Sequence, residues 1–343
     1  MKLQTLIPPT FLIFILLIGC KQTHKNEGEQ KSIFEIASTI EDSIRVGGMV
    51  IHNAFKYQIL AHQDGNFDST LISSKVYKPN QYVFDSCLSQ IFGSNGRLFE
   101  KSGLNEWNKE LFSKHDSLIR DRMQLIASIN LNDLFKNHLQ AVQNMTGQTG
   151  EGTWMVYFGP KHFQILGGCD NDAMVLDLTA KQMNSEMLNK VFAHELEHLV
   201  FGPILARDPN GDKGLGITLD EGLAVYFTYK YLKHSYEEAL YGEETEVLLN
   251  REKEIFQKLE PYFYKDNEEG CPIFRHCGRN NTCKPVIEGL PENIENELCY
   301  FLGFRIIEKY TQNHGESSWK DIYKMPLKEF YLKSGYKEYI EVK

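Results

Sequence analysis

The chain has no strongly basic segment, and acidic residues outnumber basic ones. Its 343 residues include 37 Lys or Arg and 46 Asp or Glu, which gives a formal net charge of −9. A protein of this charge repels the phosphate backbone of a nucleic acid unless a basic stripe offsets the repulsion. The sequence contains no such stripe. We therefore expect no nucleic-acid partner.

The chain also lacks internal repeats, low-complexity tracts and a recognisable linker after residue 32. Its hydrophobic fraction of 42% and charged fraction of 24% lie close to the average of globular proteins. These values exclude wholesale disorder, a collagen-like repeat and a multi-span membrane protein. One folded domain is expected over residues 33–343.

The first twenty residues read as an export signal. Lys2 gives a short positive start, and residues 12–18 form an apolar run too short to predict a bilayer span. The sequence LIGC, ending at Cys20, resembles a bacterial lipobox, in which the enzyme cuts before the cysteine and acylates it. An ordinary signal peptide and a buried helix with a chance cysteine are the alternatives.

Residues 21–32 carry almost no apolar side chain and are predicted to be a flexible tether. Together with acylation of Cys20, this predicts a lipid-anchored protein of the bacterial cell envelope. The outer membrane is favoured over the inner membrane, because Lys21 is not the aspartate associated with inner-membrane retention.

Six cysteines remain besides Cys20, and an even number in an exported chain suggests disulfides whose pairing the sequence leaves open. They are Cys87, Cys169, Cys271, Cys277, Cys283 and Cys299. Three of them lie with His276 in a polar insertion, residues 266–291. Structural zinc sites use cysteines about two to four residues apart. Here the spacing is wider, so a disulfide-stapled loop is favoured over a second metal site.

The spacing of apolar residues predicts a mostly helical α+β fold with a small sheet. Helical spacing recurs within residues 33–150, for example at Trp107, Leu111 and Leu118. A break rich in Gly and Thr follows at residues 144–152, and the segments 153–160 and 173–179 read as strands. From Asn184 onward the pattern is helical again, ending in a helix at about residues 298–310.

The pentapeptide HELEH at residues 194–198 carries two histidines four residues apart. On a helix these positions share a face, so His194 and His198 can reach one ion while Glu195 holds a water beside it. Asn184 is a good N-cap and Gly202-Pro203 a stop signal, which favours a helix here. The apolar flanks would bury this helix and its charges, and a divalent cation would then be the missing partner. An exposed helix with two unrelated histidines is the alternative.

A catalytic zinc site takes three protein ligands, and Glu221 is the candidate for the third. Glu221 stands at the expected start of a second apolar helix. The alternative is a capping box, in which Glu221 merely bonds the backbone amide of Thr218. Asp220 is expected either as another oxygen ligand or as the acceptor for an imidazole N–H.

HExxH followed by a glutamate on a later helix resembles the gluzincin branch of zinc metallopeptidases. More closely, the chain resembles a bacterial family of predicted zinc-dependent proteases, long described only as a domain of unknown function. The resemblance covers roughly residues 153–336. It rests on FAHELEHLVFG (192–202), LDEGLAVYF (219–227), YFLGFRIIEKY (300–310) and MPLKEFYLKSGY (325–336). It implies a zincin-like domain and leaves the insertion unexplained. Together with the helical spacing upstream, we expect this domain over residues 33–343, with a helical part at 33–150 and the catalytic part at 151–343.

The resemblance implies one zinc ion bound by His194, His198 and Glu221. Glu195 would then act as the general base toward a zinc-activated water. Tyr300 is the candidate for a second oxyanion donor, because gluzincin-like enzymes often place a tyrosine or histidine on a downstream helix. Packing of Tyr300 within the C-terminal helix is the alternative. His162 and His234 are expected at the surface, His234 being a weaker candidate for the same donor role.

The function predicted from these residues is a lipid-anchored zinc metallopeptidase that hydrolyses peptide bonds in peptides or proteins. A zinc-binding but non-proteolytic envelope lipoprotein and a zinc amidase acting on cell-wall material are the alternatives. If the strand at residues 173–179 is a sheet edge, it would favour recognition of an extended peptide.

Overall fold

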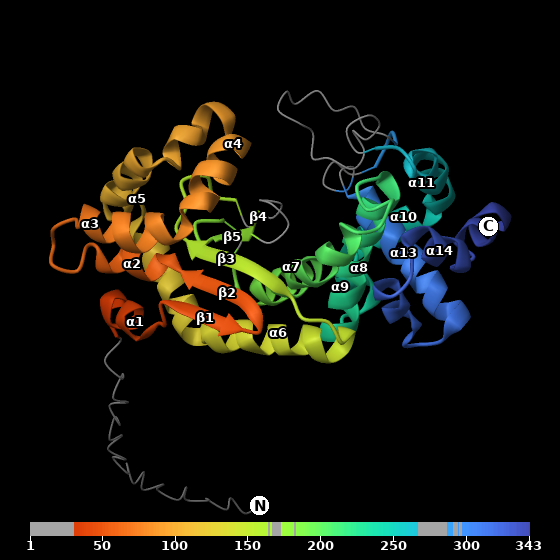
Figure 1. The fold of residues 1–343 in the computed structure, drawn as a ribbon, viewed down its shortest axis with the longest axis horizontal. Coiled ribbons are helices and arrows are strands. Elements are labelled where there is room, and N and C mark those ends of the chain that lie inside the picture. The colour runs from red at the N-terminus through yellow and green to blue at the C-terminus, as the bar shows by residue number, and fades with distance from the viewer. Residues whose placement is uncertain are drawn as a thin grey trace, which may run out of the picture. The chain divides into compact units, whose positions relative to one another are not determined.

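The computed structural model combines a small mixed sheet with many helices (Figure 1). It describes residues 31–163, 165–166, 173–181, 183–266, 287–290, 294 and 297–343. Residues 33–343 form one compact unit. The expected α+β class, with mostly helical content, is confirmed.

The sheet has five strands in the order β1-β2-β3-β5-β4. A hairpin through Gly47 pairs β1 (Ser43–Val46) with β2 (Gly48–Asn53), and Gly47 adopts a positive φ of 58° that suits glycine. β3 (Glu151–Tyr157) runs parallel to β2 and to β5 (Ala173–Asp177). β4 (Ile165–Leu166) pairs antiparallel with β5 and ends the sheet.

Two expectations about the sheet are wrong. Residues 33–150 are not wholly helical, because β1 and β2 come from this part and pair with a strand about a hundred residues later. The segment at 173–179 is not an edge, because β4 covers its outer side. All five residues of β5 are buried, as is typical of a strand inside a sheet with both faces covered.

Most of the helical residues of the N-terminal part belong to two helices, α5 (Lys101–Ile129) and α6 (Leu131–Thr146). The 16-residue α6 follows α5 through Asn130, which adopts the left-handed conformation with φ 45°. The helical segments before the second half of the sheet are α1 (Ile33–Thr39), α2 (Ala54–Leu60), α3 (Ser69–Leu71), η1 (Ile72–Tyr77), η2 (Lys78–Asn80), η3 (Val83–Leu88), α4 (Ser89–Ile91), η4 (Gly93–Leu98), α5 (Lys101–Ile129) and α6 (Leu131–Thr146).

Three long helices follow the sheet: α7 (Ser185–Leu205), α8 (Gly214–Leu232) and α13 (Leu298–His314). The side chain of Asn184 accepts a hydrogen bond from the amide of Met187, so the predicted N-cap of α7 is confirmed. The predicted stop at Gly202 is wrong: α7 continues to Leu205. Pro203 sits in the last turn, where its fixed φ is compatible with a helix and only one backbone bond is lost.

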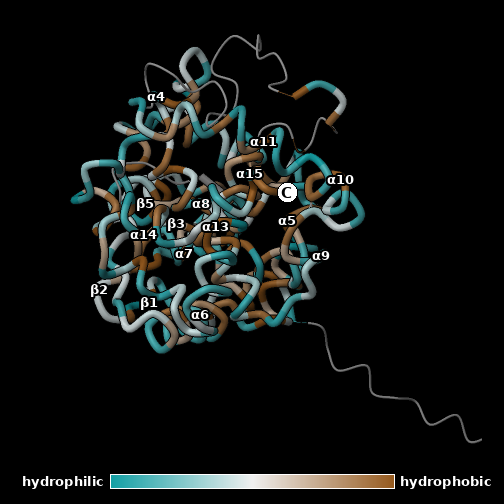
Figure 2. The backbone as a smooth tube through the Cα atoms, turned by 90° about the vertical axis from the view of Figure 1, so that its right-hand side faces the viewer, coloured by the Kyte–Doolittle hydropathy of each residue, from teal (hydrophilic) through white to brown (hydrophobic). Residues whose placement is uncertain are grey.

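Shorter helices complete the C-terminal part. They are α9 (Tyr236–Ala239), η5 (Gly242–Glu244), α10 (Thr245–Asn250), α11 (Glu252–Leu259), η6 (Glu260–Tyr262), η7 (Ser318–Tyr323), α14 (Leu327–Lys333) and α15 (Tyr336–Val342). α8 packs against both α7 and α13. These three helices lie near the centre of the view in Figure 2.

The two faces of the sheet belong to different parts of the core. Trp154 and Val156 of β3 point into the main core, which also contains apolar residues of α7, α8 and α13. Met155 and Tyr157, which alternate with them, point into a smaller core formed largely by residues 54–104. The sheet thus anchors α7 on one side and the N-terminal helical segments on the other.

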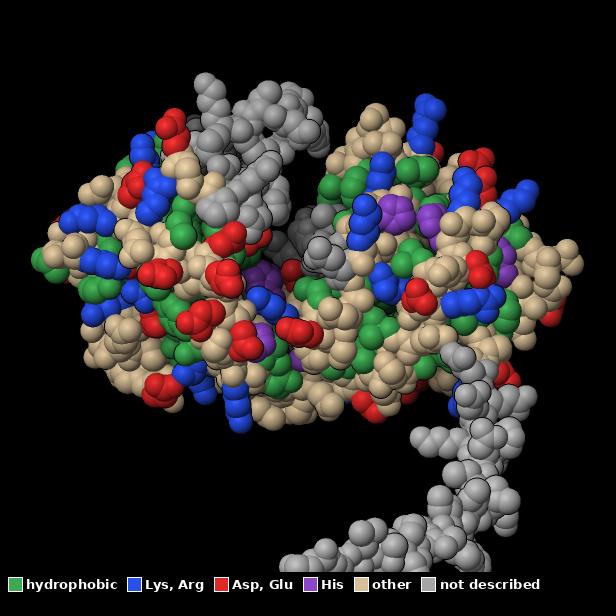
Figure 3. Space-filling model, turned by 180° about the vertical axis from the view of Figure 1, so that it is seen from behind, with side chains coloured by type: hydrophobic (Ala, Val, Ile, Leu, Met, Phe, Trp, Pro, Cys, Tyr) green, Lys and Arg blue, Asp and Glu red, His purple; other side chains and the backbone are tan. Residues whose placement is uncertain are grey.

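The surface carries charges of both signs. On the face seen in Figure 3, basic and acidic side chains are interspersed over the described residues. Among the helices of the described part, none has the length and apolarity needed to cross a membrane. The predicted export signal, Cys20 and most of the tether lie outside the described residues.

Most of the predicted cysteine chemistry also lies outside the described residues. This applies to Cys169, Cys271, Cys277, Cys283, His276 and most of the insertion at 266–291. Cys87 takes part in a disulfide. Cys299 is buried in α13.

Candidate metal centre

Three side chains from two helices converge on one point. The Nε2 atoms of His194 and His198 lie 3.1 Å apart. Oε2 of Glu221 lies 3.4 Å from the Nε2 atom of His194 and 3.3 Å from that of His198. The three ligand atoms therefore form a nearly equilateral triangle. We call His194, His198 and Glu221 the histidine–glutamate cluster.

The size of this triangle fits a zinc ion. Zinc binds imidazole nitrogen and carboxylate oxygen at about 2.0–2.1 Å in tetrahedral geometry, for which neighbouring ligand atoms lie about 3.3–3.4 Å apart. The three observed separations agree with this edge length within a few tenths of an ångström. Three protein ligands leave one tetrahedral position for water or substrate, as in catalytic zinc sites.

The hydrogen-bonding state of the cluster also favours a cation. One shared proton could join the two imidazole nitrogens, but Oε2 of Glu221 is buried and has no hydrogen-bond partner among the described residues. An unpaired buried carboxylate oxygen is costly. A divalent cation at the centre of the triangle would satisfy all three atoms together.

The two helices bring the cluster together in different ways. His194 and His198 share one face of α7 because they are one turn apart. Glu221 lies two turns inside α8, which begins at Gly214. The capping-box alternative is therefore wrong, because the hydroxyl of Thr218 donates to the carbonyl of Gly214 within the helix.

Asp220 orients one of the histidines. Its Oδ1 atom lies 3.0 Å from Nδ1 of His198 and can accept the N–H of that nitrogen. This bond places the proton on Nδ1 and leaves the lone pair of Nε2 directed at the cluster. Of the two roles predicted for Asp220, the geometry favours the acceptor of the imidazole N–H.

A buried acid beneath the cluster was missed by the sequence analysis. Glu197 is fully buried, and its Oε1 atom accepts a hydrogen bond of 2.8 Å from the hydroxyl of Tyr323. Glu197 also lies close to His198 and Asp220. Burial raises the pKa of Glu197 to about 8. Tyr323 is 126 residues away in the chain, so no local pattern could have revealed the pair.

Opposite charges stabilise each other within the cluster. Burial opposes a charge on His198, but the carboxylates of Asp220 and Glu221 hold its pKa well above the usual range. Burial likewise opposes the charge on Glu221, and the two imidazoles nevertheless hold the pKa of this carboxyl below its usual value. The site thus favours positive charge at its centre.

Glu195 is placed beside the cluster on α7. Burial raises the pKa of Glu195, and the nearby carboxylates of Glu221 and Asp220 act in the same direction against the two imidazoles. A carboxylate with a raised pKa is a stronger base toward water. The predicted position of Glu195 next to the ligands is therefore matched by suitable electrostatics.

The structure also brings Tyr300 to the cluster. Its ring stacks on that of His194, with centroids 5.9 Å apart and an angle of 11° between the planes. Burial raises the pKa of Tyr300, and the neighbouring carboxylates of Glu221 and Glu195 raise it further. The phenol therefore keeps its proton at neutral pH and can donate it in a hydrogen bond.

The two weaker histidine candidates lie in loops. His162 is exposed, as expected, and its ring packs near those of Trp107 and His115. His234 follows Lys233, the C-cap of α8, and is half-buried. Neither residue belongs to the groups of potential metal ligands found among the described residues.

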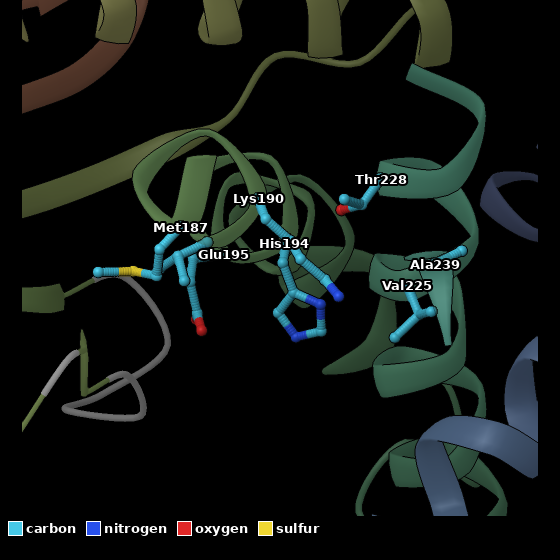
Figure 4. A pocket seen from close by; sticks show the side chains of 8 residues that line it. Met187, Lys190, His194, Glu195, Val225, Thr228 and Ala239 are labelled. Carbon is cyan, nitrogen blue, oxygen red and sulfur yellow. The ribbon is translucent and has the colours of Figure 1, made fainter. Parts of the chain in front are cut away.

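A pocket of about 270 Å³ opens beside the cluster, between α7, α8 and α9 (Figure 4). Its lining includes His194 and Glu195, so a group bound there lies next to the candidate reaction centre. The other lining residues are Met187, Lys190, Val191, Val225, Thr228 and Ala239.

Comparisons of the chain with protein-family models, with curated proteins and with solved structures find no match.

Proposed function

We propose that the chain is a zinc-dependent metallopeptidase with a zincin-like arrangement of its site. The observation that carries this proposal is the triangle of ligand atoms with edges of 3.1, 3.3 and 3.4 Å. His194, His198 and Glu221 would hold the zinc ion, and Asp220 would orient His198. The resemblance to gluzincins and to the bacterial family of predicted zinc-dependent proteases agrees with this ligand set.

Zinc bound at this site would supply Lewis acidity, which lowers the pKa of a water molecule and polarises a carbonyl group. Glu195 would take the proton of the attacking water as general base and pass it to the leaving amine. Its raised pKa suits both steps, because the carboxylate must first accept and then release a proton near neutral pH. Tyr300 would donate a hydrogen bond to the oxygen on which negative charge develops.

The pocket supports a substrate that carries side chains. It is lined by His194 and Glu195 of the candidate centre, by Lys190 and Thr228, and by the apolar residues Met187, Val191, Val225 and Ala239. A peptide whose carbonyl lies at the cluster could insert a neighbouring side chain there. This favours hydrolysis of peptide bonds.

Elemental analysis of the purified protein and cleavage of a mixed peptide library test the proposal. We expect about one zinc ion per chain and cleavage that a chelator abolishes. Glu195→Gln should keep the zinc and lose activity by orders of magnitude, whereas Glu221→Ala should lose the zinc on dialysis. Glu106→Gln, an exposed change on α5, which supplies no residue of the cluster or of the pocket lining, is the matched control and should alter neither property.

A Glu195→Gln variant with wild-type turnover would contradict the general-base role. Zinc content unchanged in Glu221→Ala would contradict the ligand role of Glu221. Release of fragments from cell-wall material without any peptide cleavage would favour the amidase alternative.

We further propose that the mature protein is anchored in the bacterial envelope through an acylated Cys20, with the outer membrane favoured. The proposal rests on the LIGC sequence and the polar residues that follow it. Mass spectrometry of the membrane fraction should find acyl chains on Cys20. A mature chain that still carries residues before Cys20 would contradict the proposal.

A further inference from the structure

The pocket beside the cluster has mainly apolar walls. Met187 and Val191 contribute from α7, Val225 from α8 and Ala239 from α9. Its volume of about 270 Å³ is larger than the apolar cavity of about 150 Å³ that is known to hold a benzene molecule. The pocket can therefore hold an aromatic ring with a substituent.

Four polar side chains also line the pocket: Lys190, His194, Glu195 and Thr228. Thr228 is only 2% exposed, and its Oγ1 atom has no hydrogen-bond partner in the part of the chain that the structure describes. Figure 4 shows the Thr228 oxygen pointing from α8 toward the side of the pocket where Lys190 and His194 lie. A buried hydroxyl without a partner is unfavourable, so a ligand that supplies the partner gains affinity.

Other threonines of this protein show that the unpaired hydroxyl is not a general property of its helices. Thr218 donates to the carbonyl of Gly214, and Thr311 donates to that of Ile307. In both cases the acceptor is the carbonyl four residues earlier, the usual partner of a helical threonine. Thr228 makes no such bond.

The charges at the pocket favour a neutral ligand. Lys190 is exposed, and its Nζ atom donates to the carbonyl of Glu238 at 3.1 Å. The carboxylates of Glu297, Glu186 and Glu238 lie close enough to interact with the Lys190 ammonium. A substrate carboxylate would therefore interact with three negative charges as well as with the Lys190 ammonium. Attraction to Lys190 would then add little to the affinity of an acidic side chain.

We propose that this pocket selects a tyrosine side chain next to the scissile bond, with Thr228 as the residue that determines the specificity. The phenol ring would pack against Met187, Val191 and Val225, and its hydroxyl would form a hydrogen bond with Oγ1 of Thr228. This inference rests on the proposed peptidase function, and its test separates the two.

The test uses short alanine peptides, blocked at both ends, with one variable residue: Tyr, Phe or Glu. Their binding to the zinc-loaded Glu195→Gln protein is measured by calorimetry, and their cleavage by the wild-type enzyme is measured in parallel. We expect the Tyr peptide to be favoured over the Phe peptide about tenfold in both assays, the value of roughly one buried hydrogen bond. The Glu peptide should bind more weakly than either.

Two variants identify the group that recognises the phenol hydroxyl. For the binding assay, each is combined with Glu195→Gln. Thr228→Val replaces the hydroxyl by a methyl group of similar size and should bring the Tyr-to-Phe ratio to about one or below. Thr228→Ser keeps a hydroxyl and should keep a preference for Tyr. A ratio that stays near tenfold in Thr228→Val would overturn the role of Thr228.

The two assays distinguish failure of the inference from failure of the proposed function. Selective binding of the Tyr peptide without cleavage of any peptide would leave the pocket assignment in place and overturn the peptidase. Cleavage of peptides with equal use of Tyr and Phe would support the peptidase and overturn the selectivity. Absence of both binding and cleavage would overturn both. The comparison of Tyr with Phe in otherwise unchanged protein decides the inference even if a Thr228 variant fails to fold.

Discussion

Gly222 of α8 and Gly303 of α13 meet backbone to backbone. A Cβ atom added to Gly222 would lie 2.3 Å from the Cα of Gly303, and one added to Gly303 would lie 1.8 Å from the carbonyl oxygen of Thr218. Glu221 directly precedes Gly222, and Tyr300 lies about one turn before Gly303. The contact of the two glycines therefore sets the distance between the carboxylate of Glu221 and the phenol of Tyr300.

Replacing Gly303 with Ala should loosen the candidate metal centre. The added methyl group meets backbone atoms that cannot rotate away, so α13 must move from α8. We expect the free energy of unfolding to fall by about 1–3 kcal/mol and the zinc affinity to fall with it. Urea unfolding and a competition titration with a zinc chelator measure the two effects.

Gly150→Ala is the control for the glycine experiment. A Cβ there would make only ordinary contacts, the nearest at 3.4 Å from a side-chain atom of Val200. This variant should keep the zinc affinity of the wild type. Equal zinc affinity in the Gly303→Ala protein would show that the close helix contact does not position the cluster.

Asp220→Ala should weaken zinc binding less than Glu221→Ala does. Asp220 contacts the far nitrogen of His198, so its loss frees the ring without removing a ligand atom. Loss of such a hydrogen-bond partner lowers metal affinity by about 10–100-fold. Affinities of both variants for zinc, measured at one pH, check the order. A loss as large as that of Glu221→Ala would make Asp220 a ligand itself.

The parts of the site that follow from local geometry could be predicted from the sequence. His194 and His198 share a face because the helical period is a property of the backbone, and the N-cap at Asn184 depends on neighbouring residues only. The role of Glu221 as a ligand could be proposed from the sequence, but its position two turns inside α8 could not be predicted. The helix begins at Gly214, before Thr218, and a Cβ added to Gly216 near its start would lie 2.2 Å from the carbonyl oxygen of Gly211, a close contact that no sequence pattern indicates.

The features that were missed depend on residues far apart in the chain. β1 and β2 are short strands, and β2 is paired with β3 from beyond α6. The hydrogen bond between Tyr323 and Glu197 joins residues 126 positions apart. Periodicity reports the burial of a segment but not its partner, so these pairings could be seen only in the folded structure.

The stability of the protein should decrease in mild acid because of His138. This residue of α6 is 2% exposed and packs against the rings of Phe192 and Tyr231, with Nε2 3.2 Å from Oδ1 of Asn189. Burial lowers the pKa of His138 to about 4, although the Asn189 side chain opposes the shift. The folded state therefore holds the ring neutral at pH values where the unfolded chain already binds a proton.

The sign and size of the effect follow from this difference. The stabilisation by neutral His138 is complete above the unfolded pKa of about 6.5 and is lost as the pH falls toward 4, at a total cost of about 3 kcal/mol. His138→Gln should remove this part of the pH dependence, even if it lowers stability at pH 7 through lost packing. Urea unfolding from pH 7.5 to 4.5 measures both slopes. Equal slopes in the two proteins would contradict the assignment.

Tyr300→Phe separates two roles that the geometry allows for the phenol. A hydroxyl that donates to the developing oxyanion acts only on the reaction, and loss of one such donor typically lowers kcat by about 10²–10³-fold. A hydroxyl that only holds Glu221 in place would act on metal binding instead, since Glu221 is a proposed ligand of the metal. We expect the first outcome, which is a large fall in kcat with a zinc affinity within about twofold of the wild type. The zinc affinity should be retained because Glu221 also faces both imidazoles and is held by the contact of α8 with α13. The ring remains to stack on His194, so the change isolates the hydroxyl. Steady-state kinetics and zinc competition on the same preparations give the answer, and a weakened metal site with unchanged kcat in the zinc-saturated enzyme would assign Tyr300 to positioning.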